Sequence, residues 1–129
     1  MLLYEEITSV IIGKSYEVMN ELGAGFLESV YHKSLYLALL QEGFRVQYEH
    51  PLPVLFRGYN VGNFKVDLVT EEKIVVEVKA VDKIIGEHKA QVINYLSASE
   101  LLVGLIINFG KQKVQTSGLE HPKLVNNTL

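Results

Sequence analysis

Residues 63–80, NFKVDLVTEEKIVVEVKA, decide the fold, because they read as two short strands joined by a polar turn at 70–73. Along each strand successive side chains face opposite sides of the sheet. The first strand therefore divides into Phe64, Val66 and Leu68 on one face and Lys65, Asp67 and Val69 on the other. The second divides into Ile74, Val76 and Val78 against Val75, Glu77 and Lys79. Charged residues thus interrupt two apolar strands, and they need a partner, water or a metal ion because burying an unpaired charge is costly.

The length of the turn decides whether these charged side chains meet. A three-residue loop at 71–73 places Asp67 directly opposite Glu77 on one face of the sheet. A two-residue loop at 71–72 would place Asp67 opposite Val76, because a slip of one residue reverses every side chain. Three-residue loops are common in hairpins, although no glycine marks the left-handed position here.

Two carboxylates that face each other repel, so the three-residue register sets two like charges opposite each other. A divalent cation between Asp67 and Glu77 would turn repulsion into coordination, through the oxygen ligands that Mg²⁺ prefers. The alternative is a charged hairpin whose polar face lies in water. On residues 63–80 alone both interpretations stay open, since short motifs often match by chance.

The composition is that of one globular domain. The 129 residues are 48% hydrophobic and 21% charged, which suits a chain with a real hydrophobic core. We expect a single domain over 1–129, with the segment from about 116 at its periphery. The absence of cysteine excludes disulfides, thiolate metal sites and cysteine nucleophiles, and it favours a cytoplasmic location.

The net charge of −3 bears on possible partners. It argues against a general nucleic-acid coat, whose affinity comes mainly from neutralising phosphates. It does not exclude an enzyme that touches nucleic acid locally, because an acidic metal site itself lowers the charge. The N-terminal residues lack the pattern of a signal peptide, and no apolar run approaches the ~20 residues that span a membrane, so we expect no membrane partner.

Hydrophobic periodicity and turn residues predict the elements around the hairpin. They are a helix at 4–22, a helix at 27–42, strands at 45–50 and 54–56, a turn at 58–62, a helix from 84 or 86 to 99, and strands at 101–109 and 113–115. Gly23 is suited to end the first helix in a left-handed conformation. Pro51 and Pro53 indicate an edge strand or a break, because proline cannot donate to a ladder. We expect residues 121–129 to fray.

This order predicts a mixed α/β sandwich. A hairpin sheet is followed by a crossover helix, which we expect to be right-handed, and by a strand at 101–109 that is covered on both faces. Glu28, Tyr31, Leu35 and Leu39 form one stripe of the second helix. A glutamate in a first helical turn is favourable for the helix dipole, but this does not explain Tyr31 one turn further on.

Four motifs in order give the chain a family resemblance. They are GFLESVY at 25–31, which matches GxxExxY, the D…ExK hairpin, the helix carrying Gln91 and Tyr95 with NYL at 94–96, and INFG at 107–110. From about Ile7 to Gly110 the chain resembles the GxxExxY family, a branch of the PD-(D/E)XK nuclease superfamily. The resemblance implies a restriction-endonuclease-like α/β fold, a mixed sheet flanked by helices with an αβββαβ core.

The resemblance also implies a metal-dependent active site. Asp67 and Glu77 would hold Mg²⁺ or Mn²⁺ with the Val78 carbonyl, and Glu28 would add a carboxylate from the helix. Lys79 would orient the attacking water or stabilise charge on the phosphate, and Gln91 would position phosphate or water. We place further residues in the substrate cleft: Tyr31, Lys65, His88 and Tyr95. The other histidines, His32, His50 and His121, lack the spacing of metal ligands.

Two functions follow. The first is a metal-dependent nuclease that hydrolyses phosphodiester bonds, in a role such as DNA repair or processing. The second is a nuclease-fold module with weak or no catalysis that acts by binding protein or nucleic acid. The residues do not distinguish DNA from RNA; of the two we expect DNA. We also expect a symmetric homodimer, formed through the apolar residues of 52–59.

Overall fold

The computed structural model describes residues 3–110 and 112–127, which form four helices and five strands. In chain order these are α1 (Glu5–Leu22), α2 (Glu28–Gln41), β1 (Val46–Phe56), β2 (Tyr59–Thr70), β3 (Ile74–Lys79), α3 (Gly86–Ser99), β4 (Val103–Asn108), β5 (Gln115–Glu120) and α4 (Pro122–Asn127). Within these two ranges no helix is long and apolar enough to cross a lipid bilayer.

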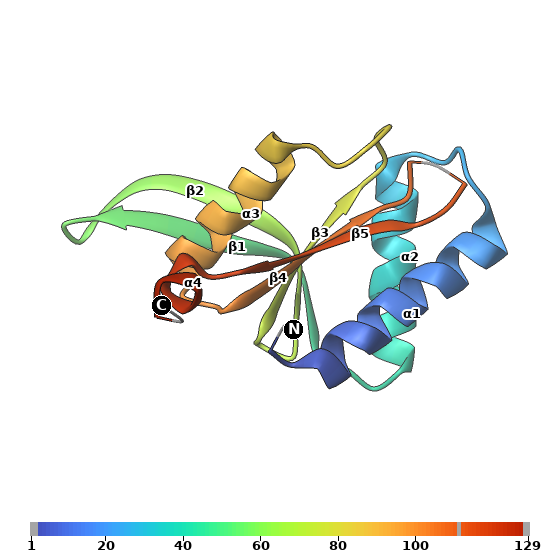
Figure 1. The fold of residues 1–129 in the computed structure, drawn as a ribbon, viewed down its shortest axis with the longest axis horizontal. Helices are drawn as coiled ribbons and strands as arrows, with labels where there is room; N and C mark the ends of the chain where they lie inside the picture. The colour runs from blue at the N-terminus through green and yellow to red at the C-terminus, as the bar shows by residue number, and fades with distance from the viewer. Residues whose placement is uncertain (1–2, 111, 128–129) are drawn as a thin grey trace.

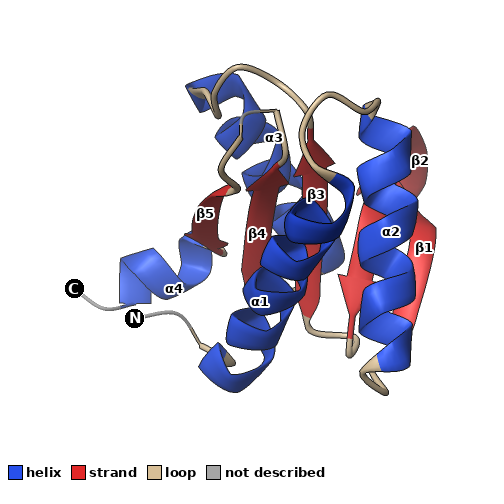
Figure 2. Cartoon of the chain, turned by 90° about the vertical axis from the view of Figure 1, so that its right-hand side faces the viewer, coloured by secondary structure: helices blue, strands red, loops and turns tan. Residues whose placement is uncertain are grey.

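The strands form one sheet in the order β1-β2-β3-β4-β5. Neighbouring strands are antiparallel except β3 and β4, which run parallel because α3 carries the chain back between them. Figures 1 and 2 show α1 and α2 on one face of the sheet and α3 on the other. The predicted mixed α/β sandwich is therefore confirmed, and its αβββαβ core runs from α2 to β4.

A hydrophobic core lies on each face of the sheet. On the α1–α2 face, Leu35 and Leu39 belong to a cluster with Val76 of β3. On the α3 face, Val92 belongs to a cluster with Val75 of β3. All of β4 is buried, as expected for a strand that is covered on both sides.

The hairpin of β1 and β2 extends beyond the rest of the sheet (Figure 1). β2 pairs with β3 only at residues 68–70, so the hairpin from 49 to 67, which we call the arm, leaves the sheet. Pro51 and Pro53 lie in β1, which is the edge strand and continues unbroken through them. The turn at the tip is shorter than predicted, because β2 already begins at Tyr59.

The side chains of β2 change faces where the arm begins. Leu68 packs in the α1–α2 core, whereas Val66 packs in the α3 core. The prediction that the two share a face is therefore wrong. The change coincides with Glu49, which adopts a left-handed φ of 50° between the pairs Tyr48↔Leu68 and His50↔Val66. A non-glycine residue with a left-handed φ is uncommon in a strand and turns the backbone locally. The alternation of side chains between the two faces of the sheet therefore does not continue through it.

The chain ends differ from the sequence prediction in detail. The last strand, β5, covers Gln115–Glu120 instead of 113–115 and pairs along the whole of β4. A short helix, α4, forms within the segment that we expected to fray, and residues 128–129 of that segment lie outside the described ranges. Gly23 ends α1 with the expected positive φ of 79°, but its ψ of 178° is extended and not helical.

Gly110 is expected to be essential for the connection from β3 to α3, because a Cβ at this position would overlap the main chain of Val81. Gly110→Ala should lower the free energy of unfolding by about 2 kcal/mol, as measured by urea denaturation. Gly13→Ala is the matched control, since Gly13 lies in α1 and the added methyl group would meet no atom within 4 Å beyond its chain neighbours and the surrounding helix backbone. That change should stabilise the helix by about 0.5–1 kcal/mol. Equal changes in the free energy of unfolding for the two substitutions would contradict the close approach of Gly110 to the Val81 main chain.

Candidate active site

The charged residues of the hairpin gather at the fork where β2 parts from β3. The last pairs of this ladder are Thr70↔Ile74, Val69↔Val75 and Leu68↔Val76. The next residue on each strand is Asp67 or Glu77, so the register is that of the three-residue turn at 71–73. The structure therefore brings the two acidic side chains opposite each other.

Two crossed hydrogen bonds bridge the fork. The Asp67 main-chain N–H donates to Glu77 Oε1 at 3.2 Å, and the Val78 N–H donates to Asp67 Oδ2 at 2.8 Å. These carboxylate oxygens take the place of the carbonyls that a continuing ladder would supply, because the strands have separated here. One oxygen of each carboxylate is thereby fixed to the main chain, and the second is directed to other partners.

Lys79 and Gln91 complete the charged group on the α3 side. Lys79 Nζ lies 3.8 Å from Glu77 Oε2 and donates to Gln91 Oε1 at 3.5 Å. Glu77 and Lys79 alternate with the core residue Val78, so both point toward α3, which carries Gln91. The structure thus assembles Asp67, Glu77, Lys79 and Gln91 in one place.

Within this charged group, the pKa of Glu77 is unusually high for a glutamate. Burial, and next the charge of Asp67, raise the pKa of Glu77 from 4.5 to about 8, although Lys79 acts in the opposite direction. Burial, and next the charges of Glu77 and Asp67, raise the pKa of Tyr95 to about 12. Glu77 therefore favours its protonated form near neutral pH, and the site favours an added positive charge.

Glu28 lies farther out. It is the first residue of α2 and is exposed, and its charge is the weakest of the influences that raise the pKa of Glu77. In the part of the chain that the structure describes, no three His, Cys, Asp or Glu side chains are close enough to hold a metal ion together. The expected convergence of three carboxylates is therefore wrong for this structure, which brings two of them together.

Tyr31 cannot line a substrate cleft as predicted, because it is fully buried. Its hydroxyl donates to the Gly23 carbonyl at 2.6 Å and accepts from the Phe26 N–H at 3.2 Å. Its ring stacks on Phe109 with centroids 4.7 Å apart. Tyr31 therefore fixes the corner between α1 and α2, and this corner sets the position of Glu28.

The other predicted cleft residues have separate surroundings. Tyr95 is 3% exposed and meets Phe64 of the arm edge to face at 5.2 Å. His88 Nδ1 accepts from the Ile85 N–H at 3.1 Å and so caps α3. Lys65 is exposed and lies 3.7 Å from Glu49, on the face of the arm opposite Phe64.

Two positioning residues were missed from the sequence. His32 Nε2 donates to the Asp67 carbonyl at 2.9 Å, and its ring stacks on Tyr48, so α2 is tied directly to the fork. The buried Asn108 side chain bonds to both the N–H and the carbonyl of Val81, at 2.9 Å each, and also to the Gly110 N–H. Asn108 had a visible signal, since it is a polar residue that ends an apolar strand. His32 had none.

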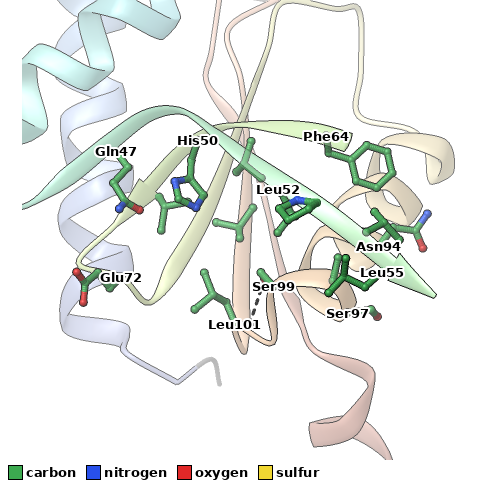
Figure 3. Close-up of a pocket in the computed structure, with 16 residues that line it drawn as sticks. Gln47, His50, Leu52, Leu55, Phe64, Glu72, Asn94, Ser97, Ser99 and Leu101 are labelled. Atoms are coloured by element: carbon green, nitrogen blue, oxygen red, sulfur yellow. Dashed lines mark hydrogen bonds between the residues drawn. The ribbon is translucent and has the colours of Figure 1, made fainter. Parts of the chain in front are cut away.

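A cavity of about 860 Å³ lies elsewhere, between the arm and the C-terminal half of α3 (Figure 3). Its walls are mostly apolar, with Gln47, His50 and Asn94 among the polar residues that line it. Asp67, Glu77 and Lys79 are not part of its lining. The cavity and the charged group at the fork are therefore separate features of the molecule.

Comparison with known proteins agrees with this architecture. A sequence profile of the PD-(D/E)XK nuclease superfamily matches residues 5–119. The structure titled "Crystal structure of SSO0001" superposes with a TM-score of 0.59 at 18% identity, over 97% of this chain and 66% of that one. At this identity the likeness concerns the fold alone. No curated protein matches the sequence. The predicted restriction-endonuclease-like α/β fold is confirmed.

The raised pKa of Glu77 predicts how stability depends on pH. In metal-free buffer the free energy of unfolding should fall as the pH rises from 4.5 to about 8, because folded Glu77 keeps a proton that the unfolded chain releases. This one group contributes at most about 1.4 kcal/mol per pH unit. Urea denaturation across this range should show a smaller slope for Glu77→Gln than for the natural protein. The same slope in the Glu77→Gln variant and the natural protein would contradict the raised pKa of Glu77.

Proposed function

The chain belongs to the PD-(D/E)XK nuclease superfamily, and we propose that it hydrolyses phosphodiester bonds of nucleic acid with the help of a divalent cation. The observation that carries this proposal is the pair of carboxylates at the fork, Asp67 and Glu77, with the Lys79 ammonium 3.8 Å from Glu77. Assignment to the GxxExxY branch, on residues 25–31, is part of the proposal.

The fork has the donor chemistry that a divalent cation requires. The charge of half-buried Asp67 acts on buried Glu77, and the pKa of Glu77 is raised by burial and by this repulsion. Mg²⁺ is often held by only one or two protein carboxylates and keeps several waters, so a pair of carboxylates is sufficient. We propose these two as ligands of Mg²⁺ or Mn²⁺, with the Val78 carbonyl beside them and Glu28 acting from the rim. When bound, such a cation lowers the pKa of water and neutralises phosphate oxygens.

The remaining side chains have defined roles in this proposal. Lys79 places a positive charge beside the carboxylates, where an attacked phosphate would carry its greatest negative charge. Gln91 holds the Lys79 ammonium through its side-chain oxygen, 3.5 Å away, and its amide nitrogen can donate to water or phosphate. Tyr95 keeps its proton, since its pKa is raised to about 12, and serves as a donor and not as a base.

A second function is favoured by a specific observation. Only two carboxylates converge among the described residues, and the net charge of the chain is −3. A nuclease-fold module that binds protein or nucleic acid without efficient cleavage would have these properties. The two functions differ in whether Lys79 affects the rate of a chemical step or only affects binding.

Several finer expectations stay predictions: DNA as the nucleic acid, a cytoplasmic location and a role in DNA repair or processing. The expected homodimer is also untested. The exposure of the arm tip supports it, because Leu55, Phe56 and Tyr59 are 63%, 56% and 76% exposed at the open edge of the sheet.

Asp67→Asn tests the metal ligands. The variant should fold, and without metal it should melt at a higher temperature, because one of two facing carboxylates loses its charge. It should also lose the rise in melting temperature that Mn²⁺ gives the natural protein by binding only the folded state. Glu5→Gln, an exposed carboxylate at the far end of α1, is the control and should keep the full response. An unchanged Mn²⁺ response in Asp67→Asn would place the metal elsewhere.

Two lysine variants separate catalysis from binding. Lys79→Ala should leave binding of nucleic acid nearly intact and lower the single-turnover rate at least tenfold, roughly the effect of losing one charge in the transition state. Lys65→Ala removes an exposed cation and should mainly weaken binding and reduce its dependence on salt. If both variants lost binding equally and cleaved at the same single-turnover rate, the binding module would be the better account.

A further inference from the structure

The corner between α1 and α2 exposes two large apolar side chains directly before Glu28. Phe26 is 47% exposed and Leu27 is 76% exposed. Single exposed apolar residues are common on protein surfaces, but an adjacent aromatic and aliphatic pair beside a charged site is not explained by packing. These two side chains are therefore candidates for contact with a functional partner outside the chain.

The pair is held outward by a rigid corner. Gly25 adopts a φ of 102°, a conformation that side chains disfavour. The buried Tyr31 hydroxyl bonds to the Gly23 carbonyl and to the Phe26 N–H, and so clamps both sides of this glycine. The Phe26 and Tyr31 rings also form a T-shaped pair with centroids 6.2 Å apart. Because the backbone is fixed in this way, the exposed pair is preorganised for a contact outside the chain.

The corner lies at the same end of the molecule as the fork. The N-terminal end of α2 and the C-terminal end of β3 are neighbours in both views (Figures 1 and 2). The Glu28 charge at this end of α2 is felt by Glu77. The corner and the fork therefore lie at one end of the molecule, linked by Glu28, which follows Leu27 directly.

The segment that forms the corner carries no cation of its own, so it does not favour a contact of the phosphate-binding kind. Residues 15–32 contain no lysine or arginine, and they include Glu17, Glu21 and Glu28. Duplex binding depends largely on neutralising phosphates, which this segment cannot do. Stacking of a base on an aromatic side chain needs no charge and tolerates any sequence. A base inside a duplex has both faces covered, so only an unpaired or terminal base offers a free face.

We propose that Phe26 and Leu27 stack on an unpaired base next to the phosphate at the fork, and that the substrate is therefore single-stranded nucleic acid or an unpaired end. This inference rests on the proposed nuclease function and narrows its substrate class. The corner supplies contact area and the fork supplies the chemistry.

A double substitution tests the preference. Phe26→Ala combined with Leu27→Ala should reduce cleavage of a single-stranded oligonucleotide about tenfold or more, which is the effect of losing one stacked base. The residual cleavage of a blunt duplex of the same sequence should change much less. The melting temperature should stay within a few degrees, because both side chains are exposed. Leu37→Ala is the control, since Leu37 is 49% exposed on α2 but lies far from the corner.

A tryptophan reporter tests the contact without requiring cleavage. The chain contains no tryptophan, so Phe26→Trp introduces a single fluorophore at the corner. A single-stranded oligonucleotide should quench its fluorescence by stacking, whereas a blunt duplex should quench it far less. Leu37→Trp, at a position with nearly the same exposure, should show no quenching with either nucleic acid.

The outcomes separate this inference from the function on which it rests. Equal loss of cleavage on single strand and duplex, or equal quenching in the Phe26→Trp and Leu37→Trp variants, would overturn the stacking contact while leaving the nuclease intact. Quenching of the Phe26→Trp variant by single strands, in a protein that cleaves nothing with Mg²⁺ or Mn²⁺, would support the contact and reject the nuclease.

Discussion

The structure depends on the crossed hydrogen bonds at the fork. Where β2 turns away from β3, the main-chain N–H groups of Asp67 and Val78 lose their place in a ladder, and carboxylate oxygens replace the missing acceptors. The arrangement forces two acidic side chains to face each other in a site where Glu77 is 5% exposed. The separation of the strands and the acidity of the site therefore have one cause. A sheet that stayed paired would have neither the arm nor the charged group.

The rest of the chain holds this fork in place from three sides. α2 reaches the Asp67 carbonyl through His32, and α3 reaches Lys79 through Gln91. From β4, Asn108 uses both of its acceptor and both of its donor positions, on Val81, Gly110 and Gln115. A fully satisfied buried amide is a rigid tie, because any shift leaves a polar atom unpaired. The loop that follows Lys79 is thus fixed before α3 begins.

The electrostatic balance of the site gives it a preference for cations. Burial and the Asp67 charge raise the pKa of Glu77 to about 8, and Lys79 compensates only in part. Outside the fork, the corner that carries Phe26 and Leu27 has apolar surface but no cation of its own. If the proposed cation binds at the fork, it would add positive charge there to that of Lys79, while the corner would offer apolar surface to a base.

The sequence by itself determined the main helices and strands around the hairpin, the sandwich and the charged positions of the two hairpin strands, because alternation and helical periodicity are local properties of the chain. It left two turn lengths open, and the structure has the three-residue turn that sets Asp67 opposite Glu77. Only the tertiary structure decided the rest. It placed Glu28 at the rim and buried Tyr31, because the depth of a helical residue depends on how α2 packs and not on its own stripe. It switched Val66 to the α3 face, at the point where Glu49 on the neighbouring strand adopts a left-handed φ. It also joined His32 to Asp67, residues separated by 35 positions, which no local pattern can encode.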